Sequence, residues 1–152
     1  MKRIALISDT HGVVTRALIE TVSGVNMIIH AGDLGSKEVF TRLSDVAPVI
    51  AVSGNVDRWN VWNKLLPDEE TIEVDGIYIY VAHILENISV SLKPAGIDVV
   101  VFGHTHMPSI GHEAGIIYIN PGSPTLPRSG AGSTIGMLEI NNGQIKSEII
   151  KI

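Results

Sequence analysis

Five short apolar runs in this sequence each end in polar residues of the kinds that bind metals, and this repeated pattern constrains the fold most strongly. In the clearest case, residues 99–102 read Val-Val-Val-Phe and are followed by Gly103, His104 and His106. A β-branched, apolar run that stops at a glycine is typical of a buried strand. Ligand sites of open α/β sheets lie at the carboxyl ends of strands, so we expect these histidines at a binding site. Two loop histidines are equally compatible with a structural role. The residues that follow the other apolar runs distinguish a binding site from that role.

The first half of the chain repeats the pattern three times. Each repeat is an apolar run expected to form a buried strand, and each is followed at once by carboxylate, imidazole or amide side chains. The runs and the polar residues that follow them are 3–8 with Asp9 and His11, 26–29 with Asp33, and 48–52 with Asn55.

Helices are expected between these strands. Apolar residues at helical spacing predict one helix over residues 14–23, ended by Gly24. A second helix is predicted from Ser36, as its N-cap, to about residue 44. Strands that alternate with helices indicate right-handed crossovers, and therefore parallel strands.

The second half begins with a hairpin pattern. Residues 71–74 and 77–82 flank an Asp-Gly pair at 75–76, which favours a tight turn between two antiparallel strands. The second of these strands leads into His83, which is the fifth occurrence of the pattern.

The rest of the second half is expected to contain one helix, a long loop and further strands. A short helix is predicted over residues 86–92, stopped by Pro94. Residues 121–133, rich in Gly, Pro and Ser, form a loop that is either disordered or shaped around a site. The last strands are expected over residues 116–119, 134–140 and 144–150.

Size and charge limit the classes of protein. A chain of 152 residues suits one domain, expected to span residues 1–152. The net charge of −5 disfavours binding to nucleic acid polymers through a basic face. There is no cysteine, which excludes disulfides and thiolate zinc sites, and no apolar run approaches the ~20 residues that cross a bilayer. We therefore expect a soluble, cytoplasmic protein that does not bind membranes.

The polar residues at the strand ends outnumber the ligands of a single metal site. A mononuclear site needs three or four ligands, so seven candidates point to two metals that share one ligand. A carboxylate can bridge two cations, and Asp33 lies in the middle of the set. Oxygen and imidazole ligands without sulfur suit Mn²⁺, Fe²⁺, Zn²⁺ or Ni²⁺, and the amide oxygen of Asn55 favours Mn²⁺. The seven candidates are Asp9, His11, Asp33, Asn55, His83, His104 and His106.

These motifs, in this order, resemble those of the calcineurin-like metallophosphoesterase superfamily. The motifs are Asp-x-His, Gly-Asp, Gly-Asn-x-Asp, a lone His after a hairpin strand, and Gly-His-Thr-His, and they cover nearly the whole chain. The size and short gaps are similar to the small single-domain phosphodiesterase branch, to which the retromer scaffold subunit is also related. The resemblance implies an α/β fold, a four-layer α/β/β/α sandwich of two mixed sheets flanked by helices.

The resemblance also implies the ligand sets and the activity. One metal would be held by Asp9, His11, Asp33 and His106, and the other by Asp33, Asn55, His83 and His104. The expected reaction is hydrolysis of a small phosphate ester, most readily a phosphodiester, by in-line attack of a metal-bridging hydroxide. Because imidazoles bind metals only when deprotonated, activity is expected to decline below about pH 6.

Two positions depart from the family pattern. Many members have a histidine in Gly-Asn-x-Asp that is thought to protonate the leaving group, and here Val56 occupies that position. Valine cannot donate a proton, so we expect a preference for aryl or nucleotide phosphodiesters over alkyl monoesters. Ile84 stands where a glycine often follows the histidine, and is expected to narrow the pocket or shift His83.

The sequence is also compatible with other functions and other residue roles. A metal-binding scaffold without turnover is the main alternative to an enzyme, and a nuclease is disfavoured by the acidity of the chain. The ligand candidates can also act as turn formers, caps or core residues. Asn55 and His104 are expected to take part in catalysis and Asp57 to orient them, although Asp57 is equally suited to capping.

The remaining polar and aromatic candidates have less specific signals. His30 and His112 lie outside the ligand pattern and are expected to be structural or surface residues. Arg58 and Arg128 flank site loops and could clamp phosphate, although surface arginines are common. Trp59 and Trp62 could mark a partner or homo-oligomer surface, or simply pack in the core.

Overall fold

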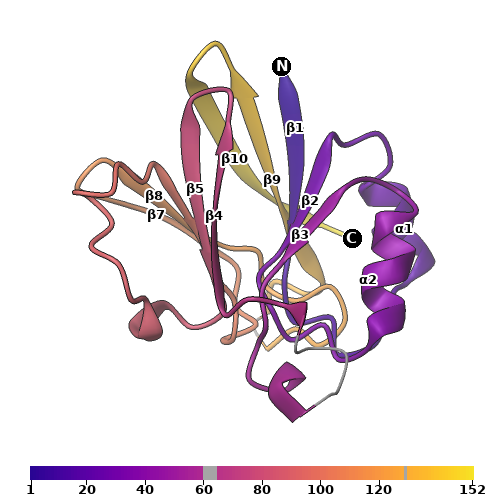
Figure 1. Cartoon of the computed structure of the whole chain (residues 1–152). Helices are drawn as coiled ribbons and strands as arrows, with labels where there is room; N and C mark the ends of the chain where they lie inside the picture. Colours follow the sequence, from indigo (N-terminus) through magenta and orange to yellow (C-terminus); the bar gives the residue numbers. More distant parts are fainter. Residues whose placement is uncertain (60–64, 129) are drawn as a thin grey trace.

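The computed structural model describes residues 1–59, 65–128 and 130–152, which form two five-stranded mixed sheets that face each other (Figure 1). The first sheet has the strand order β10-β9-β1-β2-β3 and the second the order β4-β5-β6-β8-β7. The strands of the first sheet are β1 (Lys2–Ile7), β2 (Met27–His30), β3 (Val49–Ala51), β9 (Thr134–Asn141) and β10 (Gln144–Lys151). Those of the second are β4 (Glu69–Val74), β5 (Ile77–Ala82), β6 (Val99–Val101), β7 (Ser109–Glu113) and β8 (Ile116–Asn120).

The first sheet contains the predicted parallel units. β1 pairs in parallel with β2, and β2 with β3, through crossovers that contain α1 (Arg16–Thr21) and α2 (Lys37–Ser44). Helix α1 is shorter than predicted at both ends. Thr15 caps its start, accepting a hydrogen bond from the backbone N–H of Leu18 at 3.1 Å, and Val22 rather than Gly24 is the C-cap. Helix α2 begins after Ser36 as predicted, although the serine side chain makes no capping hydrogen bond.

The second sheet combines the predicted hairpin with a parallel centre. β4 pairs antiparallel with β5 around Asp75 and Gly76, whose φ angles are 51° and 82°. β5, β6 and β8 then pair in parallel. Strand β7 was not predicted, because its sequence Ser-Ile-Gly-His-Glu is mostly polar and exposed at the sheet edge.

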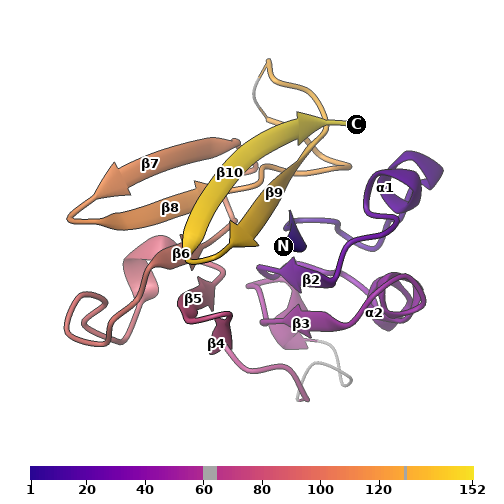
Figure 2. The same ribbon diagram turned by 90° about the horizontal axis from the view of Figure 1, so that it is seen from above.

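Apolar side chains fill two main layers. One cluster lies between the two sheets and includes Leu6, Ile29, Val101 and Ile119, all with no exposed surface. The other lies between the first sheet and the helices, with Leu18 of α1 and Leu43 of α2 fully buried. Figure 2 shows both helices on the outer side of the first sheet.

The predicted helical layer over the second sheet is wrong, and so is the helix predicted over residues 86–92. Among the described residues, that face is covered by an irregular segment with one 3₁₀ turn, η3 (Leu85–Asn87). Leu85, Ile88 and Leu92 pack there against a small cluster around Tyr80 and Val100. Pro94 and Gly96 soon follow, so this segment partly buries these apolar residues without forming an α-helix.

The topology brings the carboxyl ends of six strands to one end of the molecule. β1, β2 and β3 run in parallel in one sheet and β5, β6 and β8 in the other, with their following loops at the lower end in Figure 1. No described helix is long and apolar enough to span a membrane.

Candidate metal centre

The seven predicted ligands all follow strands at this end of the two sheets. The first sheet contributes carboxylate, imidazole and amide groups, and the second sheet contributes imidazoles only. Asp9 and His11 follow β1, Asp33 follows β2, Asn55 follows β3, His83 follows β5, and His104 and His106 follow β6.

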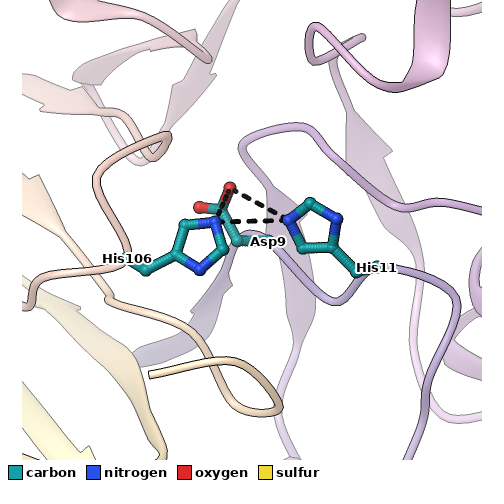
Figure 3. A group of neighbouring side chains, drawn as sticks. All are labelled: Asp9, His11 and His106. Carbon is teal, nitrogen blue, oxygen red and sulfur yellow. Dashed lines mark hydrogen bonds and ion pairs between the residues drawn. The ribbon is translucent and has the colours of Figure 1, made fainter. Parts of the chain in front are cut away.

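Asp9, His11 and His106 form one group that could hold a metal ion. Oδ1 of Asp9 lies 3.3 Å from Nε2 of His106 and 3.9 Å from Nε2 of His11. The two imidazole Nε2 atoms are 3.2 Å apart. Figure 3 shows the two rings pointing toward the carboxylate from different loops.

Asp9, Asp33 and His83 form a second group that shares Asp9 with the first. Nε2 of His83 lies 3.3 Å from Oδ2 of Asp33 and 3.9 Å from Oδ1 of Asp9. Oδ1 of Asn55 lies next to this group, 3.0 Å from Nε2 of His83 and 3.1 Å from Nδ1 of His104. Asn55 and His104 are exposed, so they form the open side of the site.

The backbone is strained at the ligand positions. Among the described residues, eight non-glycine residues have positive φ, and five of them belong to the predicted ligand set. Such conformations cost free energy and persist where the surroundings hold them, most often at functional sites. The five are Asp9 (57°), His11 (45°), Asp33 (56°), His104 (71°) and His106 (59°).

Backbone carbonyls fix the orientation of two imidazole rings. Nδ1 of His83 donates to the carbonyl of Ala31 at 2.7 Å, and Nδ1 of His106 donates to the carbonyl of Leu126 at 2.7 Å. A carbonyl can only accept, so each neutral ring carries its hydrogen on Nδ1 and turns the lone pair of Nε2 into the site.

Electron pairs therefore crowd the centre of the site. Oδ1 of Asp9 is buried and has no hydrogen-bond partner among the described residues. Oδ1 of Asn55 and Oδ2 of Asp33 both face the Nε2 lone pair of neutral His83. Buried acceptors that face one another are costly unless a proton or a cation lies between them. The residues present thus fit a pair of cations, as the two Asp/His groups indicate.

Protonation compensates part of this crowding. Burial raises the pKa of Asp9. For His83, burial acts to lower the pKa, but the hydrogen bond and negative charge of Asp33 outweigh it and raise the pKa above 6.5. The same pair lowers the pKa of Asp33 although burial opposes the shift. A proton on His83 thus occupies the position where a cation would bind.

Metal binding at the second group is expected to weaken as pH falls. The proton and the metal compete for Nε2 of His83, and the raised pKa of this ring moves the onset above 6.5 rather than to the pH 6 predicted from the sequence. The Mn²⁺ dissociation constant, measured by calorimetry from pH 8.5 to 5.5, should rise about tenfold per pH unit below that pKa. The His83–Asp33 pair acts oppositely on the metal-free fold. The stabilisation of the fold by this pair is complete below pH 6.5 and is lost as pH rises through the raised pKa of His83.

A Mn²⁺ affinity that stays constant from pH 8.5 to 5.5 would contradict the assignment of His83 as a ligand.

Asp57 lies behind the site and connects two of its loops. Its buried carboxylate accepts hydrogen bonds from the backbone N–H groups of Leu34 (3.1 Å), Gly35 (2.9 Å) and Gly54 (2.9 Å). These bonds join the loop after β2 to the loop after β3. The side chain therefore positions the segment that carries Asp33 through the backbone.

His30 has a structural position, as expected, but its role in the site was missed. It has no exposed surface, and burial lowers its pKa to about 3. Nδ1 accepts from the backbone N–H of Gly32 at 3.2 Å, so Nε2 donates to Oγ1 of Thr10 at 3.0 Å, and Thr10 donates to the carbonyl of Leu34 at 3.1 Å. This series of hydrogen bonds between uncharged groups joins the loops that carry Asp9 and Asp33.

Hydroxyl groups near the ligands were also missed by sequence reasoning. Oγ of Ser8 donates to Oδ2 of Asp9 at 2.7 Å. Ser123 and Thr125 donate to the carbonyls of Asp9 (2.8 Å) and Thr10 (2.9 Å). The last two lie more than a hundred residues from their partners, so no local spacing indicated them. The loop after β8 was predicted to be either disordered or shaped around a site, and the contacts of residues 121–128 agree with the second prediction.

Other predicted residues lie around the centre. Ile84 lines a cavity of about 250 Å³ beside His83, and Arg128 lines another of about 230 Å³ beside His106. Arg58 is exposed in the 3₁₀ turn η1 (Asp57–Trp59), and His112 is exposed on β7. The side chain of Trp59 and all of Trp62 lie outside the described residues, so the surface they could mark stays a prediction.

Comparisons with known proteins identify the family of this chain. The calcineurin-like phosphoesterase superfamily domain matches residues 1–143. A probable metallophosphoesterase of Methanocaldococcus jannaschii is 39% identical over 138 residues, covering 82% of this chain and 69% of that protein. Phosphodiesterase YfcE of Escherichia coli K12 is 29% identical, covering 91% of this chain and 88% of that protein.

The fold is also that of solved structures. Vps29 of Entamoeba histolytica, crystallised in complex with Zn²⁺, has a TM-score of 0.76 and 21% identity, over 97% of this chain and 98% of that one. At this identity the likeness concerns the fold alone. The family match and the curated relatives confirm the resemblance seen in the sequence: the chain belongs to the calcineurin-like phosphoesterase superfamily, in its small phosphodiesterase branch.

Proposed function

We propose that this protein is a binuclear-metal-dependent phosphodiesterase that hydrolyses a small phosphate ester. The observation that carries the proposal is the buried Oδ1 of Asp9. This atom has no hydrogen-bond partner within the described part of the chain, and three imidazole nitrogens approach it at 3.3 to 3.9 Å. A carboxylate oxygen in such surroundings is stabilised by cations. The phosphodiesterase named among the relatives supports the choice of reaction.

The proposed ligand sets follow the family resemblance. One ion is held by Asp9, His11, Asp33 and His106, and the other by Asp33, Asn55, His83 and His104. Oδ2 of Asp33 lies 3.7 Å from Nε2 of His11 and 3.3 Å from Nε2 of His83, which suits a bridge between the two. Oδ1 of Asp9 is 3.9 Å from the same two nitrogens, so a second carboxylate lies close to both positions.

The chain supplies a charge pattern that suits phosphate. When bound, two divalent ions, with Mn²⁺ the predicted pair, provide Lewis acidity and the hydroxide for in-line attack. With neutral histidines, Asp9 and Asp33 offset only two of the four positive charges, so the pocket attracts an anion although the chain carries −5. His104, exposed at the open side, is placed to orient the substrate, and Asp57 keeps the Asp33 loop in position.

The position of Val56 limits the leaving groups. Its backbone N–H donates to Oδ1 of Asp33 at 3.0 Å, so the residue helps to orient the proposed bridging carboxylate. Its side chain offers no proton for a departing alkoxide. Esters whose leaving group needs little protonation, such as aryl phosphodiesters, are therefore the preferred substrates.

Metal reconstitution tests the proposed function. Metal-stripped protein should regain hydrolysis of bis(p-nitrophenyl) phosphate when Mn²⁺, Ni²⁺, Fe²⁺ or Zn²⁺ is restored separately, with Mn²⁺ the most effective. Turnover of the aryl diester should exceed that of glycerol phosphate by at least about tenfold. Asn55→Ala should remove most of the restored activity, about a hundredfold, because it deletes a ligand of the second ion. Faster turnover of the alkyl monoester would contradict the leaving-group argument.

A metal-binding scaffold of the same fold is the second candidate. The missing proton donor at position 56 favours it, and the presence of every predicted ligand favours the enzyme. Calorimetric binding of two Mn²⁺ ions without turnover of any of these esters would select the scaffold. A cytoplasmic location, a single domain over residues 1–152 and a homo-oligomer stay predictions.

A further inference from the structure

Arg128 borders the proposed active site through a cavity of its own. The cavity has a volume of about 230 Å³ and is lined by His106, Leu126, Pro127 and Arg128. His106 also belongs to the first Asp/His group, so this cavity adjoins the proposed metal centre. A substrate arm that leaves the reacting phosphate on this side would meet Arg128.

The loop that carries Arg128 is fixed to the site. Oγ of Ser123 donates to the carbonyl of Asp9 at 2.8 Å and accepts from the backbone N–H of Leu126 at 2.8 Å. The carbonyl of Leu126 in turn accepts from Nδ1 of His106 at 2.7 Å. Pro127 has a restricted φ, so the backbone reaches Arg128 with little remaining freedom. The loop backbone that leads to Arg128 is therefore held beside His106.

The guanidinium is available for a ligand. Arg128 is exposed and has neither an ion pair nor a hydrogen bond within the described part of the chain. Arg3 and Arg42 already have partners: Arg3 contacts Glu139 at 3.4 Å, and Arg42 donates to the carbonyl of Val14 at 2.9 Å. An unpaired arginine beside a phosphate-binding centre can form two parallel hydrogen bonds to a carboxylate or phosphate.

A second cavity, beside the other Asp/His group, has the reverse charge. The cavity of about 250 Å³ beside His83 is lined by Asp68 and Glu69, together with Asn87 and Ser89. Burial acts to raise the pKa of Glu69, but hydrogen bonds from Ser89 outweigh it and hold that pKa below its usual value. Glu69 is therefore anionic and disfavours a negative group on this side. An anionic substrate arm is directed to the Arg128 side.

We propose that Arg128 is a substrate-binding residue that selects phosphodiesters with a second anionic group, a carboxylate or a phosphate, on one ester arm. This inference rests on the proposed function and adds the substrate class. The arm is remote from the reacting phosphorus, so the contact lowers KM and leaves kcat nearly unchanged.

Three matched substrates test the inference. Each is a p-nitrophenyl phosphodiester whose second arm is the same short alkyl chain, ending in a carboxylate, a phosphate or a neutral amide. With the Mn²⁺-loaded protein, KM for the better of the two anionic arms should be about fivefold lower than for the amide. Arg128→Gln should reduce that ratio to about one, and Arg128→Lys should keep part of it because it retains charge but not the planar fork. Salt at about 0.5 M should shrink the ratio.

Arg3→Gln is the matched control, since it removes the same charge at the start of β1, the end of that strand away from the centre. The ratio should survive this change. An equal KM for all three substrates, or a preference that persists in Arg128→Gln, overturns the inference and leaves the proposed function standing. Absence of turnover with all three overturns both. The better anionic arm identifies carboxylate or phosphate as the preferred group.

Discussion

Asp9→Asn is expected to abolish hydrolysis, by about a thousandfold or more, while it stabilises the metal-free protein. The carboxylate belongs to both Asp/His groups, so its loss weakens both proposed metal positions. In the metal-free fold, however, the buried Oδ1 has no hydrogen-bond partner among the residues that the structure describes. An amide nitrogen at that position can donate to Nε2 of His106, which lies 3.3 Å away. The remaining oxygen can still accept from Ser8 and from the backbone N–H of His104.

The stabilisation should be about 1 kcal/mol, because it replaces an unsatisfied buried acceptor by a hydrogen bond. For a chain of this size, that corresponds to a rise in Tm of about 2–4 °C in chelator. Asp75→Asn is the control: it makes the same change at the β4–β5 turn, where Asn-Gly is equally suitable, and should alter neither activity nor Tm. A metal-free Asp9→Asn protein that melts below the wild type would show that the carboxylate stabilises the fold without cations.

Among substitutions that add a single methyl group, Gly54→Ala is expected to reduce stability and metal binding most. A Cβ at this position would overlap both the backbone nitrogen and Oδ1 of Asp33. Neither atom can move freely, because Gly54 also donates to Asp57 at 2.9 Å and Val56 donates to the same Asp33 oxygen. We expect a loss of about 3 kcal/mol in the free energy of unfolding, as for other overpacked sites. Displacement of Asp33 should also remove metal binding.

Urea unfolding of the metal-free protein and Mn²⁺ calorimetry measure the two effects of Gly54→Ala separately. Gly111→Ala serves as the control, since a Cβ there meets nothing within 4 Å and its φ is ordinary. That variant should unfold within about 0.5 kcal/mol of the wild type. A Gly54→Ala protein that keeps its stability and its metal affinity would show that the loops around Asp33 adapt.

The order of strands and ligand types is readable in the sequence because both depend on local patterns. Each of the buried strands β1, β2, β5 and β6 is a largely apolar run, and the first ligand candidate stands within three residues of its end. The edge strand β7 lacks such a run. Its extended conformation depends on antiparallel pairing with β8 rather than on its own residues. The segment 84–98 contains apolar residues that suit a helix, but its packing on Tyr80 and Val100 requires only an irregular chain.

The supporting contacts of the site could not be read from the sequence. Ser123 contacts Asp9 across 114 positions, and the ring of His83 is held by a backbone carbonyl, which has no sequence signature. Proximity along the chain indicated Asp57, whose bonds to residues 34 and 35 are nevertheless long-range. The ligands follow strands in the sequence and can be predicted from it. The groups that orient the ligand side chains depend on how the loops pack against one another.

The two sheets contribute different members of one ligand cluster: Asp9 and Asp33 come from the first sheet, and His83 and His106 from the second. Cations bound there would connect the two halves of the sandwich at one end, in addition to the apolar layer between them. Affinity for the ions is then coupled to the relative placement of the sheets. Removal of the ions would then weaken the contact between the two sheets, and the Tm of the protein should rise with the free concentration of the ions.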